Sequence, residues 1–414
     1  MSRVGNLSAK RIERSENGSV RRFYSRSKRR SVRATRWFES SARLGLLPKV
    51  GAVVSLVALG SAVGCTSLRG GGGGPREATL HHRLAAEPAP LRGSPLRGKT
   101  GIRLLVAAKP QPLVLDVDSG SARRVRGVPS VGRYGGIEIV GVRGRAGVVI
   151  ATPIRRRRPI WPRGRLYAVR EKWAWLSALG AGDEVVPAAD GGSVWVKRYA
   201  RLRPARSCTL RQVRLDGRVM GAPRAFRCAL TIYPGGALGL GVSPTRVIDP
   251  VTGRTVLRTR SPILAVAGRE VVLEERAQDR AGEEFGLLDS ATGAERRIGW
   301  PSTGGALEYS SLAVSPPLVA VGFASPIGRQ VWDVWVLNTE TATLTELPDM
   351  PAFVAVKRAN MTWTRDGRLV LLAESAGKDV VAVWQPGQKR LKVKTVRLPG
   401  RRNAGSDAFA ILGS

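Results

Sequence analysis

From residue 101 to the C-terminus, short apolar runs alternate with turn residues, and helical periodicity is almost absent. Runs rich in β-branched and aromatic residues, bounded by Gly, Pro, Asp and Asn, are typical of β-strands joined by tight turns. The clearest stretch predicts four consecutive strands, at Met361–Trp363, Arg368–Ala373, Val380–Trp384 and Lys392–Leu398. The pattern therefore predicts an all-β body over residues 101–414.

One hairpin signature recurs through this body. An apolar strand ends in Asp or Asn, two variable residues follow, and Ser or Thr then precedes Gly or Ala. The four clear copies begin at Asp116, Asp249, Asp289 and Asn338; weaker copies lie at Asp216, at Gln385 and near Leu166–Val169. The Asp or Asn side chain can cap the N–H groups of a turn, and the last residue can take the left-handed conformation that returns the chain. The signature thus predicts equivalent hairpins.

The spacing of these hairpins indicates the architecture. Repeats of about 40–50 residues, each with several strands, are typical of β-propeller blades. At that spacing residues 101–414 divide into about seven units, although six or eight stay open. We therefore predict an all-β β-propeller of seven four-stranded blades.

The two ends of this body complement each other. Residues 407–412 form a predicted strand with no unit of its own, whereas the first unit opens at Ile102–Ala107 without an innermost strand. An unclosed propeller would leave unpaired strand edges. We therefore predict that the C-terminal strand pairs beside Ile102–Val106 and closes the ring.

A local motif in the last unit points to a family of folds. The sequence WTRDGRL at residues 363–369 resembles the W-S-x-D-G-x-x blade signature of TolB-type and WD-repeat-like β-propellers. Residues 312–316 followed by 319–321 resemble the same strand pair more loosely. The resemblance covers most of residues 101–414. It implies a fold and carries over no catalytic residue.

The segment before the body resembles an export signal. Residues 1–49 are basic, and residues 50–64 form the charge-free run VGAVVSLVALGSAVG. As a helix this run rises only about 22 Å, less than the roughly 30 Å of a bilayer core, which suits a signal-peptide hydrophobic region. The run ends in AVGC at 62–65, which resembles the lipobox of bacterial lipoproteins and implies that Cys65 carries the lipid. An N-terminal signal anchor and ordinary signal cleavage stay open.

Residues 66–100 connect this signal to the body. Five consecutive glycines at 70–74 and a stretch rich in Pro, Gly, Ala and Arg predict a flexible linker. The expected domains are thus a basic region (1–49), a signal, lipobox or anchor segment (50–65), the linker (66–100) and the propeller (101–414). This order predicts an extracytoplasmic bacterial protein anchored to the cell membrane.

Histidine content narrows the chemistry of the body. The chain has two histidines, at 81 and 82, so residues 83–414 contain none. Ser–His and Cys–His nucleophile pairs and His-ligated zinc are therefore excluded there. The acidic pairs Glu274-Glu275 and Glu283-Glu284 lack a metal-like spacing, and we interpret them as solvated charges. We expect no catalytic residue, metal or cofactor.

Two cysteines remain besides Cys65. Cys208 and Cys228 lie nearly symmetrically about the predicted turn at Asp216-Gly217. Facing positions on a hairpin bring Cα atoms to about 4.5–5.5 Å, within disulfide range. We predict a disulfide in an oxidising compartment, with two buried free thiols as the alternative.

The chain is strongly basic, with a formal net charge of +37. The densest run in the body is Arg155, Arg156, Arg157 and Arg158. This run is a candidate anion-binding site, with a solvated loop as the alternative. Tryptophans in or beside strand-like runs are interpreted as packing between sheets; they are Trp173, Trp175, Trp195, Trp332, Trp335 and Trp363.

These features together indicate a function by binding. We predict an exported, membrane-tethered, monomeric β-propeller that acts as a non-catalytic binding or scaffold protein at the cell envelope. The expected partner is a protein, a peptide or an envelope polymer, and nucleic acid is the least expected ligand. Two alternatives stay open: a carboxylate-based propeller hydrolase or lyase, and a cytosolic anion-binding scaffold.

Overall fold

The fold is known from a computed structural model that describes most of the predicted body. The described residues are 91–142, 146–152, 163–170, 176–188, 190–199, 207–227, 246–249, 251–252, 254–276, 283–301, 306–324, 331–350, 361–375, 377–404 and 408–413. The predictions on residues 1–90, on the arginine run at 155–158 and on Cys228 lie outside them. Apart from one short 3-10 helix, η1 (Arg401–Asn403), the described elements are β-strands.

Three sheets contain the first strands of the body and the last strand of the chain. The seam blade, named for joining the first and last parts of the predicted body, has the order β27-β2-β3-β4, with β2 (Arg103–Val106), β3 (Leu113–Asp116), β4 (Ala122–Arg124) and β27 (Phe409–Gly413). The second sheet contains β5 (Gly136–Val142), β6 (Ala146–Thr152), β7 (Gly164–Arg170) and β8 (Leu176–Gly182). The third contains β9 (Glu184–Pro187), β10 (Ser193–Tyr199), β11 (Ser207–Arg214) and β12 (Val219–Arg227).

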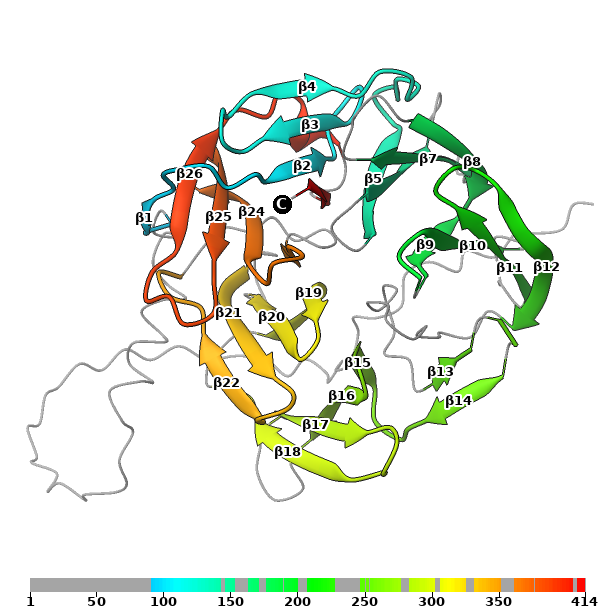
Figure 1. Cartoon of the computed structure of the whole chain (residues 1–414), viewed down its shortest axis with the longest axis vertical. Helices are drawn as coiled ribbons and strands as arrows, with labels where there is room; N and C mark the ends of the chain where they lie inside the picture. Colours follow the sequence, from blue (N-terminus) through cyan, green and yellow to red (C-terminus); the bar gives the residue numbers. More distant parts are fainter. Residues whose placement is uncertain are drawn as a thin grey trace, which may run out of the picture. The chain divides into compact units, whose positions relative to one another are not determined.

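Four sheets follow in chain order around the propeller (Figure 1). A two-stranded sheet pairs β13 (Arg246–Ile248) with β14 (Thr255–Arg258). The next sheet contains β15 (Ile263–Ala267), β16 (Glu270–Arg276), β17 (Glu283–Asp289) and β18 (Glu295–Gly299). The sheet after it contains β19 (Ala306–Ser315), β20 (Leu318–Ala324), β21 (Val331–Asn338) and β22 (Thr343–Glu346). The last blade has the order β1-β26-β25-β24-β23, with β1 (Ser94–Pro95), β23 (Met361–Trp363), β24 (Leu369–Ser375), β25 (Lys378–Trp384) and β26 (Lys392–Val396).

The chain is therefore an all-β β-propeller, as its repeat predicted. The number of four-stranded blades differs from the prediction, because the described residues form six sheets of four or five strands instead of seven. The remaining sheet, β13–β14, has two strands, and residues 228–245 before it lie outside the described part of the chain. The hairpin signature at Asp249 identifies an outer hairpin without establishing a complete blade.

The C-terminal strand pairs where the sequence indicated. Strand β27 is antiparallel to β2, with Leu104 opposite Ile411 and Val106 opposite Phe409. Every residue of β27 is buried. Figure 1 shows β27, in dark red at the C-terminus, beside β2. The seam blade thus combines residues more than 300 positions apart in the sequence.

Apolar side chains fill the spaces between adjacent blades. One core cluster joins the seam blade to the last blade and includes Leu104, Leu372 and Ile411. Another joins the seam blade to the β5–β8 sheet and includes Leu105, Val149 and Ala410. Alternate residues of β27 therefore contribute to two different cores, as expected for a strand buried on both faces.

The predicted hairpin turns are present. In the β17–β18 turn the Ala291 N–H donates to Asp289 Oδ1 at 2.8 Å, and Gly293 has a φ of 74°. This backbone hydrogen bond lowers the pKa of Asp289. In the β21–β22 turn the Glu340 N–H donates to Asn338 Oδ1 at 3.0 Å, and Ala342 takes the left-handed position with a φ of 56°. In both turns the Asp or Asn side chain accepts a backbone N–H, and the last residue of the signature takes the left-handed conformation, as predicted.

The four strands predicted for the last blade agree with β23, β24, β25 and β26.

The tryptophans whose side chains are described pack as predicted. Trp363 is buried, and its indole Nε1 donates to the Ala313 carbonyl at 3.1 Å across the blade boundary. Trp195 is also buried, and Trp335 packs partly buried against a core cluster. These three side chains pack between or within sheets, whereas the side chains of the other predicted tryptophans lie outside the described residues.

The linker prediction is wrong for its last ten residues. Strand β1 pairs in parallel with β26 and adds a fifth strand to the last blade, with Ser94 opposite Lys392. The Leu91 N–H also donates to Ser375 Oγ at 2.7 Å. A strand of two residues without apolar alternation leaves no periodic signal, and its pairing depends on an open sheet edge formed by distant sequence.

The cysteine hairpin has a different register from the one assumed. Cys208 lies opposite Phe226 in the β11–β12 pair. Val213 pairs with Val219 around the turn, and the bulge between Leu210 and Gln212 shifts the register by two residues, which brings Phe226 and not Cys228 opposite Cys208. Cys208 is disulfide-bonded in the structure. Cys228 lies two residues beyond Phe226 and outside the described residues, so the pairing of the two cysteines stays a prediction and their directly facing arrangement is corrected.

Candidate functional site

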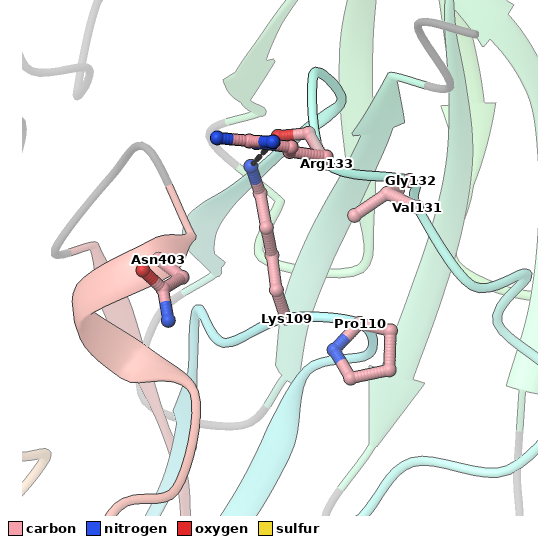
Figure 2. Close-up of a pocket in the computed structure, with 6 residues that line it drawn as sticks. All are labelled: Lys109, Pro110, Val131, Gly132, Arg133 and Asn403. Carbon is pink, nitrogen blue, oxygen red and sulfur yellow. Dashed lines mark hydrogen bonds between the residues drawn. The ribbon is translucent and has the colours of Figure 1, made fainter.

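A cavity of ≈ 470 Å³ opens at one end of the seam blade. Three segments form it: the β2–β3 connection, the β4–β5 connection and η1, which precedes β27. We call it the seam pocket, and its described lining residues are Lys109, Pro110, Val131, Gly132, Arg133 and Asn403 (Figure 2). The four strands of the seam blade alternate in direction, so the β2–β3 and β4–β5 connections leave from the same end of that blade.

Backbone hydrogen bonds hold the three segments together. The Lys109 N–H donates to the Gly400 carbonyl at 3.0 Å, which joins the β2–β3 connection to the segment before η1. The Val131 N–H donates to the Pro110 carbonyl at 2.9 Å, which joins the same connection to the following one. The walls of the pocket are therefore fixed by main-chain contacts and do not depend on a ligand.

Gly400 permits the closest of these approaches. It has a φ of +81°, and a Cβ at this position would lie 2.0 Å from the Lys109 carbonyl oxygen. Backbone cannot move aside as a flexible side chain can. A glycine is therefore required here both for its left-handed conformation and for its lack of a side chain.

We expect Gly400→Ala to destabilise the protein more than Gly387→Ala does. Gly387 has a φ of +87° with nothing near its missing Cβ, so both variants incur the left-handed cost of about 1–2 kcal/mol. Only Gly400→Ala adds the clash with Lys109. Urea unfolding of the two variants measures the difference in their free energies of unfolding. Equal losses of stability would show that the close approach of Gly400 to Lys109 does not contribute to the effect.

Two cationic side chains contribute hydrogen-bond donors to the pocket. Lys109 Nζ donates to the Arg133 carbonyl at 3.1 Å (Figure 2). Partial burial lowers the pKa of Lys109 from its ordinary 10.5. The Arg133 guanidinium carbon lies 6.0 Å from the ring centroid of Tyr134, which is 45% exposed. None of the described lining residues is acidic.

Asn403 is positioned by the ion pairs of its neighbours. Arg401 is only 1% exposed, and its Nη1 lies 2.6 Å from Asp379 Oδ1 on β25. Arg402 Nη2 lies 3.2 Å from Glu374 Oε1 on β24. These two arginines pair with carboxylates of the last blade, whereas no described carboxylate lies within ion-pair distance of Lys109 or Arg133. The pocket thus retains positive charge beside neutralised arginines.

This set of groups favours binding of an anion. An ammonium has three donors, of which the Arg133 carbonyl accepts one, and the guanidinium and the amide of Asn403 add further N–H groups. The described lining residues contain no histidine or carboxylate that could act as a general base. The geometry is suited to recognition of an oxyanion.

One glutamate from each of the two acidic pairs contacts the same arginine. Glu275 and Glu284 face each other across β16 and β17, and Arg297 on β18 lies 3.2 Å and 3.9 Å from their carboxylates. The Glu275 side chain is 10% exposed and also accepts from Ser261 Oγ at 2.9 Å. The interpretation as solvated charges is therefore wrong for Glu275, because the strand register brings it under Arg297.

A second ionic group was not identified from the sequence. Lys197 Nζ lies 3.1 Å from Glu184 Oε2, and the side chain of Lys197 is only 8% exposed. The Tyr199 hydroxyl donates to the same carboxylate oxygen at 3.1 Å. The run SVWVKRY contains Lys197 at the same alternation as the buried Trp195, which is the signal that could have indicated a buried lysine.

The sequence-predicted sites lie mostly beyond the described residues. Cys65 and the run Arg155–Arg158 are among those not described, and Cys208 is the only member of the predicted set in the described part. In the described residues there is no cluster of three potential metal ligands. The same part of the chain contains no helix with the length and apolar character to cross a membrane.

Comparisons with known proteins find similar solved structures and no similar sequence. No protein-family model and no curated protein matches the chain. The crystal structure of TolB from Acinetobacter baumannii is similar, with 10% identity and a TM-score of 0.44 over 77% of this chain and 68% of TolB. A Lactobacillus plantarum protein matches with 10% identity and a TM-score of 0.44 over 76% of this chain and 100% of its own. An oligogalacturonate lyase in complex with manganese has 13% identity and a TM-score of 0.31 over 69% and 72%. These similarities are at low sequence identity and low TM-score, and nothing about family or activity follows from them.

Proposed function

We propose that this protein is an exported, membrane-tethered β-propeller that acts by binding, without covalent chemistry, at the cell envelope. The seam pocket is the observation that carries the proposal. It brings the donors of Lys109, Arg133 and Asn403 to a rigid rim where no described lining residue is acidic. Concave sites with a few fixed polar groups on a rigid scaffold are typical of ligand recognition.

The run Arg155–Arg158 supports recognition of an anionic partner through its charge. Four consecutive guanidinium groups make it the densest positive charge in the sequence of the body. We propose that this run attracts anionic partners to the protein.

The finer architecture is also part of the proposal. The β13–β14 hairpin carries the signature of the third and fourth strands of the other sheets, and successive innermost strands contact one another from β15 to β19 to β23 and on to β27. We propose that β13–β14 are the outer half of a seventh blade and that the β27–β2 pair closes the ring. The protein would then be a rigid monomeric platform for a protein, peptide or envelope polymer.

Mass spectrometry of the mature N-terminus tests the export part of this proposal. We expect a diacylglyceryl-modified Cys65 at the start of the chain and recovery in the membrane fraction. Cys65→Ala should leave the chain uncleaved at this position and without the lipid. Cys208→Ala is the matched control, because it removes a different cysteine and should not change the N-terminus. An unprocessed, soluble wild-type chain in the cytosol would contradict the proposal and favour a cytosolic scaffold.

A further inference from the structure

We infer that the seam pocket is a binding site for a compact oxyanion, a carboxylate or phosphate group carried by a small ligand. The inference deepens the proposed function and rests on its claim that the protein acts by binding at this pocket. It names the chemical class that the pocket recognises, which neither the fold nor the similar structures supply.

Convergence of donors is the first argument. Lys109 follows β2 and Asn403 precedes β27, almost 300 residues later in the sequence. Figure 2 shows the two residues on different walls of the same cavity. The Lys109 ammonium is oriented by its 3.1 Å hydrogen bond to the Arg133 carbonyl. That bond uses one of its three protons and leaves two for a ligand. An oxyanion can accept from several such donors at once, which makes these hydrogen bonds stronger than neutral ones.

The second argument is that this charge differs from the general basicity of the chain. Several arginines near the pocket and elsewhere have carboxylate partners, such as Arg401 with Asp379, Arg402 with Glu374 and Arg269 with Asp289. Lys109 has no carboxylate partner among the described residues, and it is partly removed from solvent. Burial penalises its charge, as the lowered pKa shows, and an anion in the pocket would offset that penalty.

The third argument is preorganisation. The Lys109 and Val131 N–H groups tie the pocket walls through the Gly400 and Pro110 carbonyls, at 3.0 Å and 2.9 Å. Fixed walls reduce the conformational entropy lost on binding. The volume of ≈ 470 Å³ exceeds what one phosphate group fills, so the pocket has room for the rest of a small ligand beside its anionic group. The exposed Tyr134 ring beside Arg133 offers a flat apolar surface at the rim.

Calorimetric titration of the full chain tests the inference, with inorganic phosphate and acetate as separate probes at constant sodium chloride. We expect Lys109→Met to weaken binding of the preferred anion at least tenfold, because a charge-assisted hydrogen bond is lost. Arg124→Gln is the matched control. It removes one exposed positive charge from β4 of the same blade and should change the affinity less than twofold.

The outcomes separate a built site from diffuse attraction. Stronger binding of phosphate identifies a phosphate ligand and stronger binding of acetate a carboxylate, and both results support the inference. Equal weakening by Lys109→Met and Arg124→Gln, or no saturable binding of either anion, would overturn it. If Lys109→Met fails to fold, Asn403→Leu at an exposed position provides the same comparison. The titration does not depend on Cys65 processing, so failure of the export proposal is seen separately.

Discussion

Removal of residues 405–414 is expected to lower the melting temperature by more than 10 °C or to prevent folding. The deletion removes β27, whose five residues are all buried. Phe409 and Ile411 pack toward the last blade, whereas Ala410 and Leu412 pack toward the β5–β8 sheet. Each large buried side chain contributes about 1.5–3 kcal/mol, and whole domains are stable by only about 5–15 kcal/mol. The loss would also expose the β2 edge.

Thermal melting followed by circular dichroism measures this effect, with two point variants as a scale. Ile411→Ala should cost about 2–5 kcal/mol, as do other truncations of buried aliphatic side chains. Val256→Ala on β14 removes an exposed side chain and should cost less than about 0.5 kcal/mol. A truncated chain that melts within 2 °C of the full chain would show that β27 does not hold the seam blade together.

The repeating hairpins could be predicted because their chemistry is local. Asp289 and Asn338 cap turns within three residues of themselves, so the sequence window contains all the atoms involved. The pairing of β27 with β2 was predicted from the two ends of the body. The last predicted strand had no unit of its own, and the first unit lacked an innermost strand. Strand alternation and turn chemistry therefore sufficed for the β-propeller fold, but not for the number of four-stranded blades.

The candidate site could not be predicted, because its residues become neighbours only when the last strand of the propeller body pairs with the first. Asn403 lies almost 300 residues from Lys109, and no motif includes both. Their proximity depends on Gly400, whose role is visible only from its distance to the Lys109 carbonyl. The pairing of β1 with β26 could not be predicted for the same reason. Nothing in the two residues of β1 indicates which sheet edge they pair with.

Asp379→Ala is expected to destabilise the protein by about 3–5 kcal/mol. The substitution removes the carboxylate 2.6 Å from Arg401, a guanidinium that is almost fully excluded from solvent. Deleting one partner of a buried ion pair leaves the other charge desolvated, which accounts for the size of the loss. The change should also loosen η1, and with it Asn403 in the seam pocket. Urea unfolding at neutral pH measures the free energy.

Two comparisons identify the buried charge as the cause. Glu374→Ala breaks the exposed pair with Arg402 on the same short helix and should cost less than about 1 kcal/mol, because solvent screens that pair. Adding Arg401→Met to Asp379→Ala removes the stranded charge and should restore a large part of the lost stability. If Asp379→Ala costs no more than Glu374→Ala, the pair does not anchor η1. The seam pocket would then depend on its backbone hydrogen bonds at Gly400 and Pro110 alone.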